Sequence, residues 1–262
     1  MPIDMSFHWE MLSDGDRNEA YRDAIQQQAR GRVVYDLGAG VGPMSYYALA
    51  AGARRVYGFE IDRDAYPYLR RLARAFPNFV PLRRDVLRGR FPQELPELAI
   101  CEMWSVWLTD WPMVRALNRL HRAAPRCPVI PARGHHVIQL VRARERAGLP
   151  LSLAPGAEAA LFGSGTATEE MSLPVRVAVT DFRGVVGALD VTVAVVPLTS
   201  GRVDAVRLWS YEEVSPGRIL PRVATRSDAL LRWIPPVQVT EGRRVRLRIR
   251  HRWGPGLSIS VL

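Results

Sequence analysis

A glycine-rich turn between a predicted strand and a predicted helix constrains the fold of this chain more than any other feature. The turn has the sequence DLGAGVG over residues 36–42, and it follows a buried apolar run over 33–36. A helix is predicted over 43–51, because proline stands at its start and Gly52 at its end. Alternating glycines let the backbone approach a ligand closely, and the helix start behind them offers free N–H groups. The turn therefore predicts a ligand-binding site at one edge of a sheet.

Short apolar runs alternate with helical segments from about residue 32 to residue 144. Strands are predicted over 33–36, 56–60, 79–85 and 98–103, further helices over 65–76 and 114–124, and an extended segment over 129–141. This alternation implies a parallel sheet with right-handed crossovers. We therefore expect an α/β domain over residues 31–145. A helical segment over 1–30 precedes it, because Tyr21 and Ile25 are spaced as on one helix face.

The helical period is lost beyond about residue 145. A segment over 149–168, rich in Gly, Pro, Ala and Ser, predicts a connection, and alternating segments follow at 175–179, 189–196, 203–209 and 244–250. In the last of these, Val245, Leu247 and Ile249 alternate with four arginines, which is typical of an antiparallel strand with one solvated side. We expect a β-barrel or sandwich over residues 146–262, packed on the α/β half.

The acid that ends the second predicted strand indicates which ligand the turn binds. Glu60 lies 24 positions after Asp36, close to the spacing of about 20 expected for an acid that holds a ribose. A dinucleotide site would have G-x-G-x-x-G, whereas Gly38, Gly40 and Gly42 give G-x-G-x-G. The leading Asp36 and this spacing favour S-adenosylmethionine (SAM) over NAD. The alternative is a tight turn in an α/β domain that binds nothing.

About half of the chain resembles the protein arginine methyltransferases. Residues 8–25 resemble that family's helix before its first motif, 33–42 its first SAM motif, and 51–60 the segment that ends in its ribose-binding acid. Cys101-Glu102-Met103-Trp104 lies where the family has Ser-Glu-Trp-Met, at the start of its double-glutamate loop. Residues 131–133 resemble the strand that leaves the SAM domain. The resemblance implies a Rossmann-like SAM-binding domain followed by a β-barrel-like all-β domain.

The resemblance also implies which residues bind the cofactor. Arg17 would pair with the SAM carboxylate, Asp36 and the glycines would hold the methionine portion and the ribose, and Glu60 would bind the ribose hydroxyls. Asp85 and Val86 would lie against the adenine. The full set implied for the cofactor is Arg17, Asp36, Gly38, Gly40, Gly42, Glu60, Asp85 and Val86.

For catalysis, the resemblance implies that Met11 borders the reacting centre and that Glu102 is the first of two glutamates that hold the substrate. The family's second glutamate falls nine positions later, where this chain has Trp111, and Asp110 is the nearest replacement. A guanidinium is held best by two carboxylates. This departure therefore favours an acceptor other than a protein arginine.

Tryptophans crowd the loop after Glu102. Trp104, Trp107 and Trp111 either wall a pocket for an amine or pack between the domains. The family's barrel motif Thr-His-Trp is not kept, and Leu231-Arg232-Trp233 stands near its place. The candidate substrate-binding residues are Trp104, Trp111 and Trp233.

We therefore expect a SAM-dependent N-methyltransferase that acts on an amine or guanidine nitrogen of a small molecule or peptide, as in natural-product biosynthesis. One alternative is a protein arginine N-methyltransferase, and another is a SAM-fold scaffold without activity. A third is a nucleic-acid methyltransferase, which would fit 36 arginines, no lysine and a net charge of +10. However, the arginines are spread along the chain, and residues 101–104 lack the Asn-Pro-Pro-Tyr typical of amino-methylating nucleic-acid enzymes.

Composition excludes several other classes. Two cysteines, Cys101 and Cys127, give neither a disulfide scaffold nor a four-ligand zinc site. His135 and His136 are adjacent on an extended segment and point to opposite faces, so we expect no metal cofactor. Neither a signal peptide nor a membrane helix is expected, which predicts a cytoplasmic protein. A homodimer like that of the family is one expectation, although residues 142–173 do not resemble the family's dimerisation arm.

Overall fold

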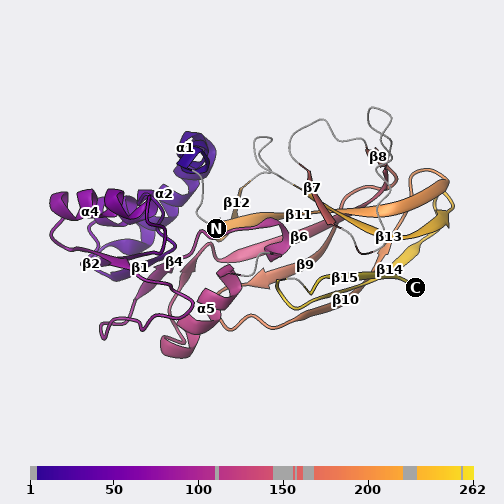
Figure 1. Ribbon diagram of the computed structural model, residues 1–262. Coiled ribbons are helices and arrows are strands. Elements are labelled where there is room, and N and C mark those ends of the chain that lie inside the picture. Colours follow the sequence, from indigo (N-terminus) through magenta and orange to yellow (C-terminus); the bar gives the residue numbers. More distant parts are fainter. Residues whose placement is uncertain are drawn as a thin grey trace.

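Two units lie side by side in the computed structural model: an α/β unit, which contains the N-terminal helices, and a β-rich unit (Figure 1). The structure describes residues 5–109, 112–143, 156, 158–161, 168–220, 229–254 and 256–262. None of the helices in these residues is long and apolar enough to cross a membrane.

A five-stranded parallel sheet forms the centre of the α/β unit, in the order β3-β2-β1-β4-β5. Its strands are β1 (Val33–Leu37), β2 (Arg55–Glu60), β3 (Phe79–Arg83), β4 (Leu98–Ile100) and β5 (Val129–Ile130). The helices of this unit are α1 (Met5–Ser13), α2 (Gly15–Ala29), α3 (Pro43–Ala50), α4 (Tyr66–Ala75) and α5 (Pro112–Ala123), with a short 3-10 helix η1 (Val106–Leu108). The predicted alternation of strands and helices is confirmed.

Helices cover both faces of this sheet, as a parallel sheet requires. Apolar side chains of α2, α3 and α4 pack with Val34 and Val56 on one face, and those of α5 pack with Val33 and Tyr35 on the other. Every residue of β1 is buried. Only the carboxyl edge of the sheet is left for polar side chains, and β1 and β2 end there at Leu37 and Glu60.

The β-rich unit consists of two antiparallel sheets around one apolar core. One sheet has the order β7-β13-β11-β6-β8, with β12 on β11 and β9 on β6, and the other has the order β10-β14-β15. The strands are β6 (Arg133–Ala143), β7 (Glu158–Leu161), β8 (Thr168–Glu170), β9 (Val175–Asp181), β10 (Leu189–Val195), β11 (Gly201–Ser215), β12 (Arg218–Ile219), β13 (Ala229–Val239), β14 (Val245–His251) and β15 (Ser258–Val261). The predicted fold class is confirmed.

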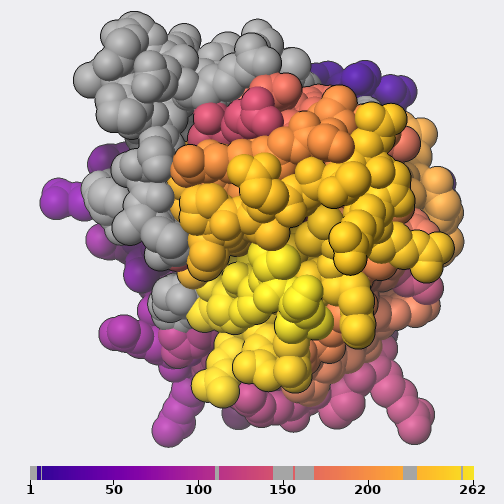
Figure 2. Space-filling view, turned by 90° about the vertical axis from the view of Figure 1, so that its right-hand side faces the viewer, coloured from indigo at the N-terminus to yellow at the C-terminus, as the bar shows by residue number. Residues whose placement is uncertain are grey.

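The arginine-rich strand predicted near the C-terminus is β14. Leu247 and Ile249 are fully buried, while Arg248 and Arg250 reach the carboxylate of Asp190 on the neighbouring β10. The C-terminal strands form much of the surface that faces the viewer in Figure 2. The arginine face is thus a partly ion-paired outer surface of the second sheet.

The chain passes from one unit to the other earlier than the predicted boundary at residue 145. β5 completes the parallel sheet, whereas β6, which starts three residues after β5 ends, pairs with β11, β9 and β8 of the β-rich unit. An extended apolar segment has the same pattern in either sheet, so the sequence could not show which sheet receives it. Structurally, residues 133–143 belong to the β-rich unit.

Candidate active site

The predicted cofactor residues meet at the carboxyl edge of the parallel sheet. Asp36 lies in β1, Glu60 ends β2, and Glu102 follows β4 after one residue. The carboxylates of Glu60 and Glu102 are both close enough to raise the pKa of Asp36. The edge of the sheet is therefore a site of concentrated negative charge.

The glycine turn is closely covered by two other segments. Gly38 has φ +81°, and a Cβ there would lie 2.7 Å from Cγ of Met103, the residue after Glu102. Gly40 has φ +55°, and a Cβ there would lie 2.9 Å from Cε1 of His8 in α1. Side chains at either position would be strained and would collide with these neighbours. The turn thus brings the loop after β4 and the helix α1 into contact with the same few residues.

Glu60 is held by backbone amides. Its Oε2 accepts a hydrogen bond from the Gly40 amide at 2.7 Å, and its Oε1 accepts from the amides of Ile61 and Asp62 at 2.7 and 2.6 Å. A carboxylate offers about four acceptor positions. Three of them are therefore taken by the backbone, and Glu60 connects the glycine turn to the end of β2.

Asp36 is almost completely buried beneath the turn. Its Oδ2 accepts a hydrogen bond of 2.6 Å from the hydroxyl of Ser45 in α3. Burial raises the pKa of Asp36 to about 7, and the nearby charges of Glu60 and Glu102 contribute in the same direction. Its charge therefore changes within the physiological pH range.

Glu102 is paired with Arg17. Nη2 and Nε of Arg17 lie 2.7 and 2.9 Å from Oε1 of Glu102, and both side chains are largely buried. Nη1 of Arg17 donates to Asn18, and Nδ2 of Asn18 donates to the carbonyl of Met11 at 3.0 Å. The resemblance had assigned Arg17 to the SAM carboxylate, and the structure shows Glu102 as its partner. Met11, Arg17 and Glu102 are thus brought together.

A second buried carboxylate reaches this cluster from the β-rich unit. The hydroxyl of Tyr21 in α2 donates a short hydrogen bond to Oε2 of Glu212 in β11. The guanidinium of Arg17 lies 5.3 Å from the centre of the Tyr21 ring. Burial, followed by the charge of Glu212, raises the pKa of Tyr21 well above its ordinary value, so its hydroxyl keeps its proton. Glu212 is not among the residues predicted from the sequence, because no local motif marks it.

The residues implied for the adenine lie after β3. Asp85 caps a turn, because its Oδ1 accepts from the amide of Leu87 at 2.8 Å, and Val86 is buried among the residues packed on α5. Both follow the carboxyl end of β3, which lies at the same edge of the sheet as Asp36 and Glu60.

The tryptophans separate into different environments. Trp104 packs edge-on against Phe182 and above Gly134, between the two units. Trp107 is fully buried and donates to the carbonyl of Val137. Trp233 packs with Val141, Ala205 and Leu231 inside the β-rich unit, and the structure does not bring it to Glu102. Asp110 and Trp111 lie outside the described residues.

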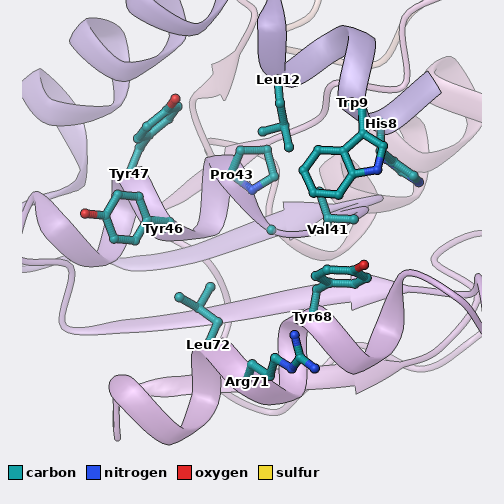
Figure 3. Close-up of a pocket in the computed structure, with 11 residues that line it drawn as sticks. His8, Trp9, Leu12, Val41, Pro43, Tyr46, Tyr47, Tyr68, Arg71 and Leu72 are labelled. Atoms are coloured by element: carbon teal, nitrogen blue, oxygen red, sulfur yellow. The ribbon is translucent and has the colours of Figure 1, made fainter. Parts of the chain in front are cut away.

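A cavity of about 410 Å³ adjoins the helix side of the glycine turn. Figure 3 shows Trp9 from α1 above Tyr68 from α4, with Val41 between them in that view. Of the predicted cofactor-binding residues that the structure describes, only Gly42 lines this cavity. His8, which also lies over Gly40, is a further lining residue, and its buried Nε2 has no hydrogen-bond partner among the described residues.

These residues fit SAM as a ligand. Two of the glycines keep Cβ atoms out of the turn, the N-terminus of α3 follows it, and the carboxylates of Asp36 and Glu60 favour a cationic sulfonium. The unpaired Nε2 of His8 adds a polar atom beside Gly40 that a ligand can satisfy. His8 lies within the stretch that resembles the family, but the resemblance implies no role for it.

Comparison with known proteins agrees with this geometry. No protein-family model matches the chain. A probable protein arginine N-methyltransferase 6 of Arabidopsis thaliana is 33% identical over 110 residues, which are 41% of this chain and 24% of that protein. Protein arginine N-methyltransferase PRMT10 of Oryza sativa subsp. japonica is 35% identical over 105 residues, 39% of this chain and 26% of that protein. An uncharacterized protein of Methanothermobacter thermautotrophicus is 34% identical over 113 residues, 43% of this chain and 44% of that protein.

The fold extends the similarity to both units. The structure of the Trypanosoma brucei PRMT1 enzyme-prozyme heterotetrameric complex with AdoHcy matches with a TM-score of 0.77, over 93% of this chain and 87% of that chain, at 18% identity. The matched segments span 24% to 44% of the length of the three relatives above. The predicted resemblance to protein arginine methyltransferases is confirmed, and the chain has a methyltransferase fold of that kind.

Proposed function

We propose that this protein is a SAM-dependent N-methyltransferase that methylates an amine or guanidine nitrogen of a small molecule or peptide. The observation that carries this proposal is the position of Glu102. Its side chain is held by Arg17, and the next residue, Met103, packs against Gly38. A carboxylate there accepts a hydrogen bond from the acceptor nitrogen and offsets the positive charge that grows on it. The names of the relatives support the same reaction class.

In this proposal the cofactor is bound by the glycine turn, Asp36 and Glu60. SAM supplies an electrophilic methyl group on a sulfonium. Glu60 would bind the two ribose hydroxyls. Because three amides take about three of its four acceptor positions, it would release the Gly40 amide to do so. The Gly40 amide lies just before α3 and would then donate its hydrogen bond to the ligand. The protein thus acts mainly by positioning the reacting groups.

The choice of acceptor depends on the loop after η1. With Trp111 where the family's second glutamate falls, this loop offers a ring face and one N–H donor in place of a carboxylate. We propose an amine, or the guanidine of one dedicated small partner, as the acceptor. A biosynthetic setting and a cytoplasmic location remain predictions that accompany this choice.

A protein arginine N-methyltransferase is the second candidate. Glu212 favours it, because the β-rich unit brings a second buried carboxylate to the Tyr21–Arg17–Glu102 cluster. Two carboxylates are what a guanidinium needs. The names of two relatives point the same way.

One assay separates the two candidates. The full chain is incubated with SAM and either an Arg-Gly-rich peptide or a panel of primary amines, secondary amines and small guanidines, and methyl gain is read by mass spectrometry. Methylation confined to the panel supports the small acceptor, and gain of peptide methylation in Trp111→Glu strengthens it. Efficient methylation of the peptide by the wild type would instead establish the second candidate. If SAM is not consumed with any acceptor, the proposed function is wrong.

We also propose that two copies of the chain form a homodimer, and the heterotetrameric complex of the Trypanosoma brucei neighbour supports assembly in a protein of this fold. Light scattering on the purified protein tests this, and a monomer at micromolar concentration would contradict it.

A further inference from the structure

A second polar site lies on the opposite face of β11 from Glu212. Glu212 and Glu213 are adjacent in this strand, so their side chains point to opposite faces. Glu212 meets Tyr21 of the α/β unit, whereas Glu213 meets His135 of β6, with Oε2 2.9 Å from Nε2. In Figure 1, β6 lies beside β11 in the same sheet. The His135–Glu213 pair therefore belongs to a separate site from the one described above.

The protonation of this pair follows from its contacts. Burial alone would raise the pKa of Glu213, but hydrogen bonds from His135 and the Gly217 amide, and the charge of Arg133, outweigh it, so its pKa lies below the ordinary value. An ionised carboxylate only accepts hydrogen bonds. Nε2 of His135 therefore carries a proton, and Nδ1 is the nitrogen left for another partner.

Nδ1 of His135 has no such partner among the residues that the structure describes. The His135 side chain is more than nine-tenths buried, and its Nδ1 is shielded from bulk solvent. Buried polar atoms in folded proteins are nearly always hydrogen-bonded. His135 also lines the cavity described next, but its shielded Nδ1 does not face that open space.

This cavity has a volume of about 420 Å³ and is lined by His135, Val137, Arg176, Tyr211 and Ile219. Register brings these residues together, because His135 pairs with Tyr211 across β6 and β11, and Val137 pairs with Arg176 across β6 and β9. Val137 and Ile219 supply apolar contacts. The polar groups come from three different strands and converge on one space.

Arg176 is an exposed arginine at this cavity, and the two nearby acids are paired with other residues. Glu213 is shared by His135 and Arg133, and Asp181 accepts from Arg183 at 2.9 Å. Within the described part of the chain, neither the guanidinium of Arg176 nor the hydroxyl of Tyr211 has a hydrogen-bond or ion-pair partner. A guanidinium binds the two oxygens of a carboxylate or phosphate with a matching fork, and a phenol adds a further hydrogen bond.

We propose that this cavity is a binding site for the carboxylate or phosphate group of a small organic anion, held by Arg176 and Tyr211 beside the ring of His135. Val137 and Ile219 contact the apolar part of the same molecule. The site does not depend on the proposed methyl transfer, and its occupancy is measured without any activity assay.

Imidazole NMR signals of the full chain test the proposal. The protein has five histidines, and His135→Gln assigns the relevant signal. Inorganic phosphate, acetate and butanoate are titrated separately, with chloride keeping the ionic strength constant. We expect a saturable shift of the His135 signal with phosphate or with the carboxylates. Saturation by phosphate alone identifies a phosphate ester as the ligand class, and saturation by acetate and butanoate identifies a carboxylate.

Three variants make the test specific. Arg176→Gln should weaken the anion about tenfold or more, and Tyr211→Phe should weaken it severalfold, because each removes a donor. Arg246→Gln, an exposed arginine of β14, is the matched control and should leave the affinity unchanged. Unmoved signals of the other four histidines confirm that each variant is folded. A shift that rises linearly with concentration, or that is the same in wild type, Arg176→Gln and Tyr211→Phe, would overturn the proposal.

Discussion

Arg17 in α2 and Glu102 after β4 form a buried ion pair across 85 positions of sequence, with 2.7 Å between Nη2 and Oε1. Burial would lower the pKa of Arg17, but the charge and hydrogen bond of Glu102 and the charges of Tyr21 and Glu212 together outweigh it and raise the pKa, so the guanidinium stays charged. The pair fixes the direction of a carboxylate at the edge of the sheet where ligands bind. It also connects the helix before the first strand to the candidate catalytic loop.

The first prediction concerns the charge of Glu102. Glu102→Gln keeps the shape of the side chain and an oxygen that can accept from Arg17, but it removes the negative charge. We expect SAM affinity by calorimetry to stay within about threefold and turnover to fall by about 100-fold or more, because catalytic electrostatics are commonly of that size. Glu241→Gln, at an exposed turn, is the matched control. Wild-type turnover in Glu102→Gln would mean that the acid is structural.

The second prediction concerns the stability of the same pair. Arg17→Gln leaves Glu102 without its buried cation, and breaking a buried ion pair costs about 3–5 kcal/mol. Urea unfolding should show a loss of this order, whereas adding Glu102→Gln should recover part of it. Strictly additive losses in the double variant would show that the two side chains do not interact in solution.

The third prediction concerns the bond between the two units. Tyr21→Phe removes the donor to Glu212, and a buried acceptor that loses its partner costs about 1–3 kcal/mol. We expect a lower free energy of unfolding, with part of the loss restored by Tyr21→Phe combined with Glu212→Gln, which carries no charge. Tyr46→Phe, at a half-exposed ring of α3, serves as the control. Equal stability of Tyr21→Phe and wild type would exclude a stabilising contact.

The fourth prediction concerns pH. Burial raises the pKa of Asp36 to about 7, so the site gains a negative charge as pH rises through 7. SAM, a sulfonium cation, should bind up to about tenfold more tightly at pH 8 than at pH 6. The free energy of unfolding changes with pH in the opposite direction. The folded state keeps the Asp36 proton at pH values where the unfolded chain has lost it, so stability falls as pH rises from about 4 to 7. Asp36→Asn should remove both trends, and a persistent SAM trend would assign it to another group.

The parts of this fold that follow local periodicity were predictable. Strand and helix alternation placed Asp36, Glu60 and Glu102 at one edge, because the carboxyl ends of parallel strands meet there. Long-range pairing was not predictable. Arg17 matched a family position assigned to the cofactor, and nothing local showed that Glu102 is its partner.

The β-rich unit shows the same limit. Glu212 and Glu213 differ only in the face that each occupies, and the sequence does not show which of them meets Tyr21, 191 positions from Glu212. Trp233 lies next to the place of a family motif, yet its face of β13 packs on Val141 and Ala205. A one-residue change in register reverses every side chain of a strand, so short motifs in strands carry little information about position.

The most direct test of the central claim is calorimetric titration of SAM into wild type and Glu60→Gln. We expect saturable SAM binding by the wild type. Glu60→Gln should weaken SAM by about ten- to a hundredfold, because hydrogen bonds to a charged group contribute about 1.5–3 kcal/mol. Thermal unfolding of the same variant separates this effect from loss of the amide contacts of Glu60. Unchanged SAM affinity in folded Glu60→Gln would contradict the ribose assignment, and tight NAD binding with no SAM binding by the wild type would contradict the account as a whole.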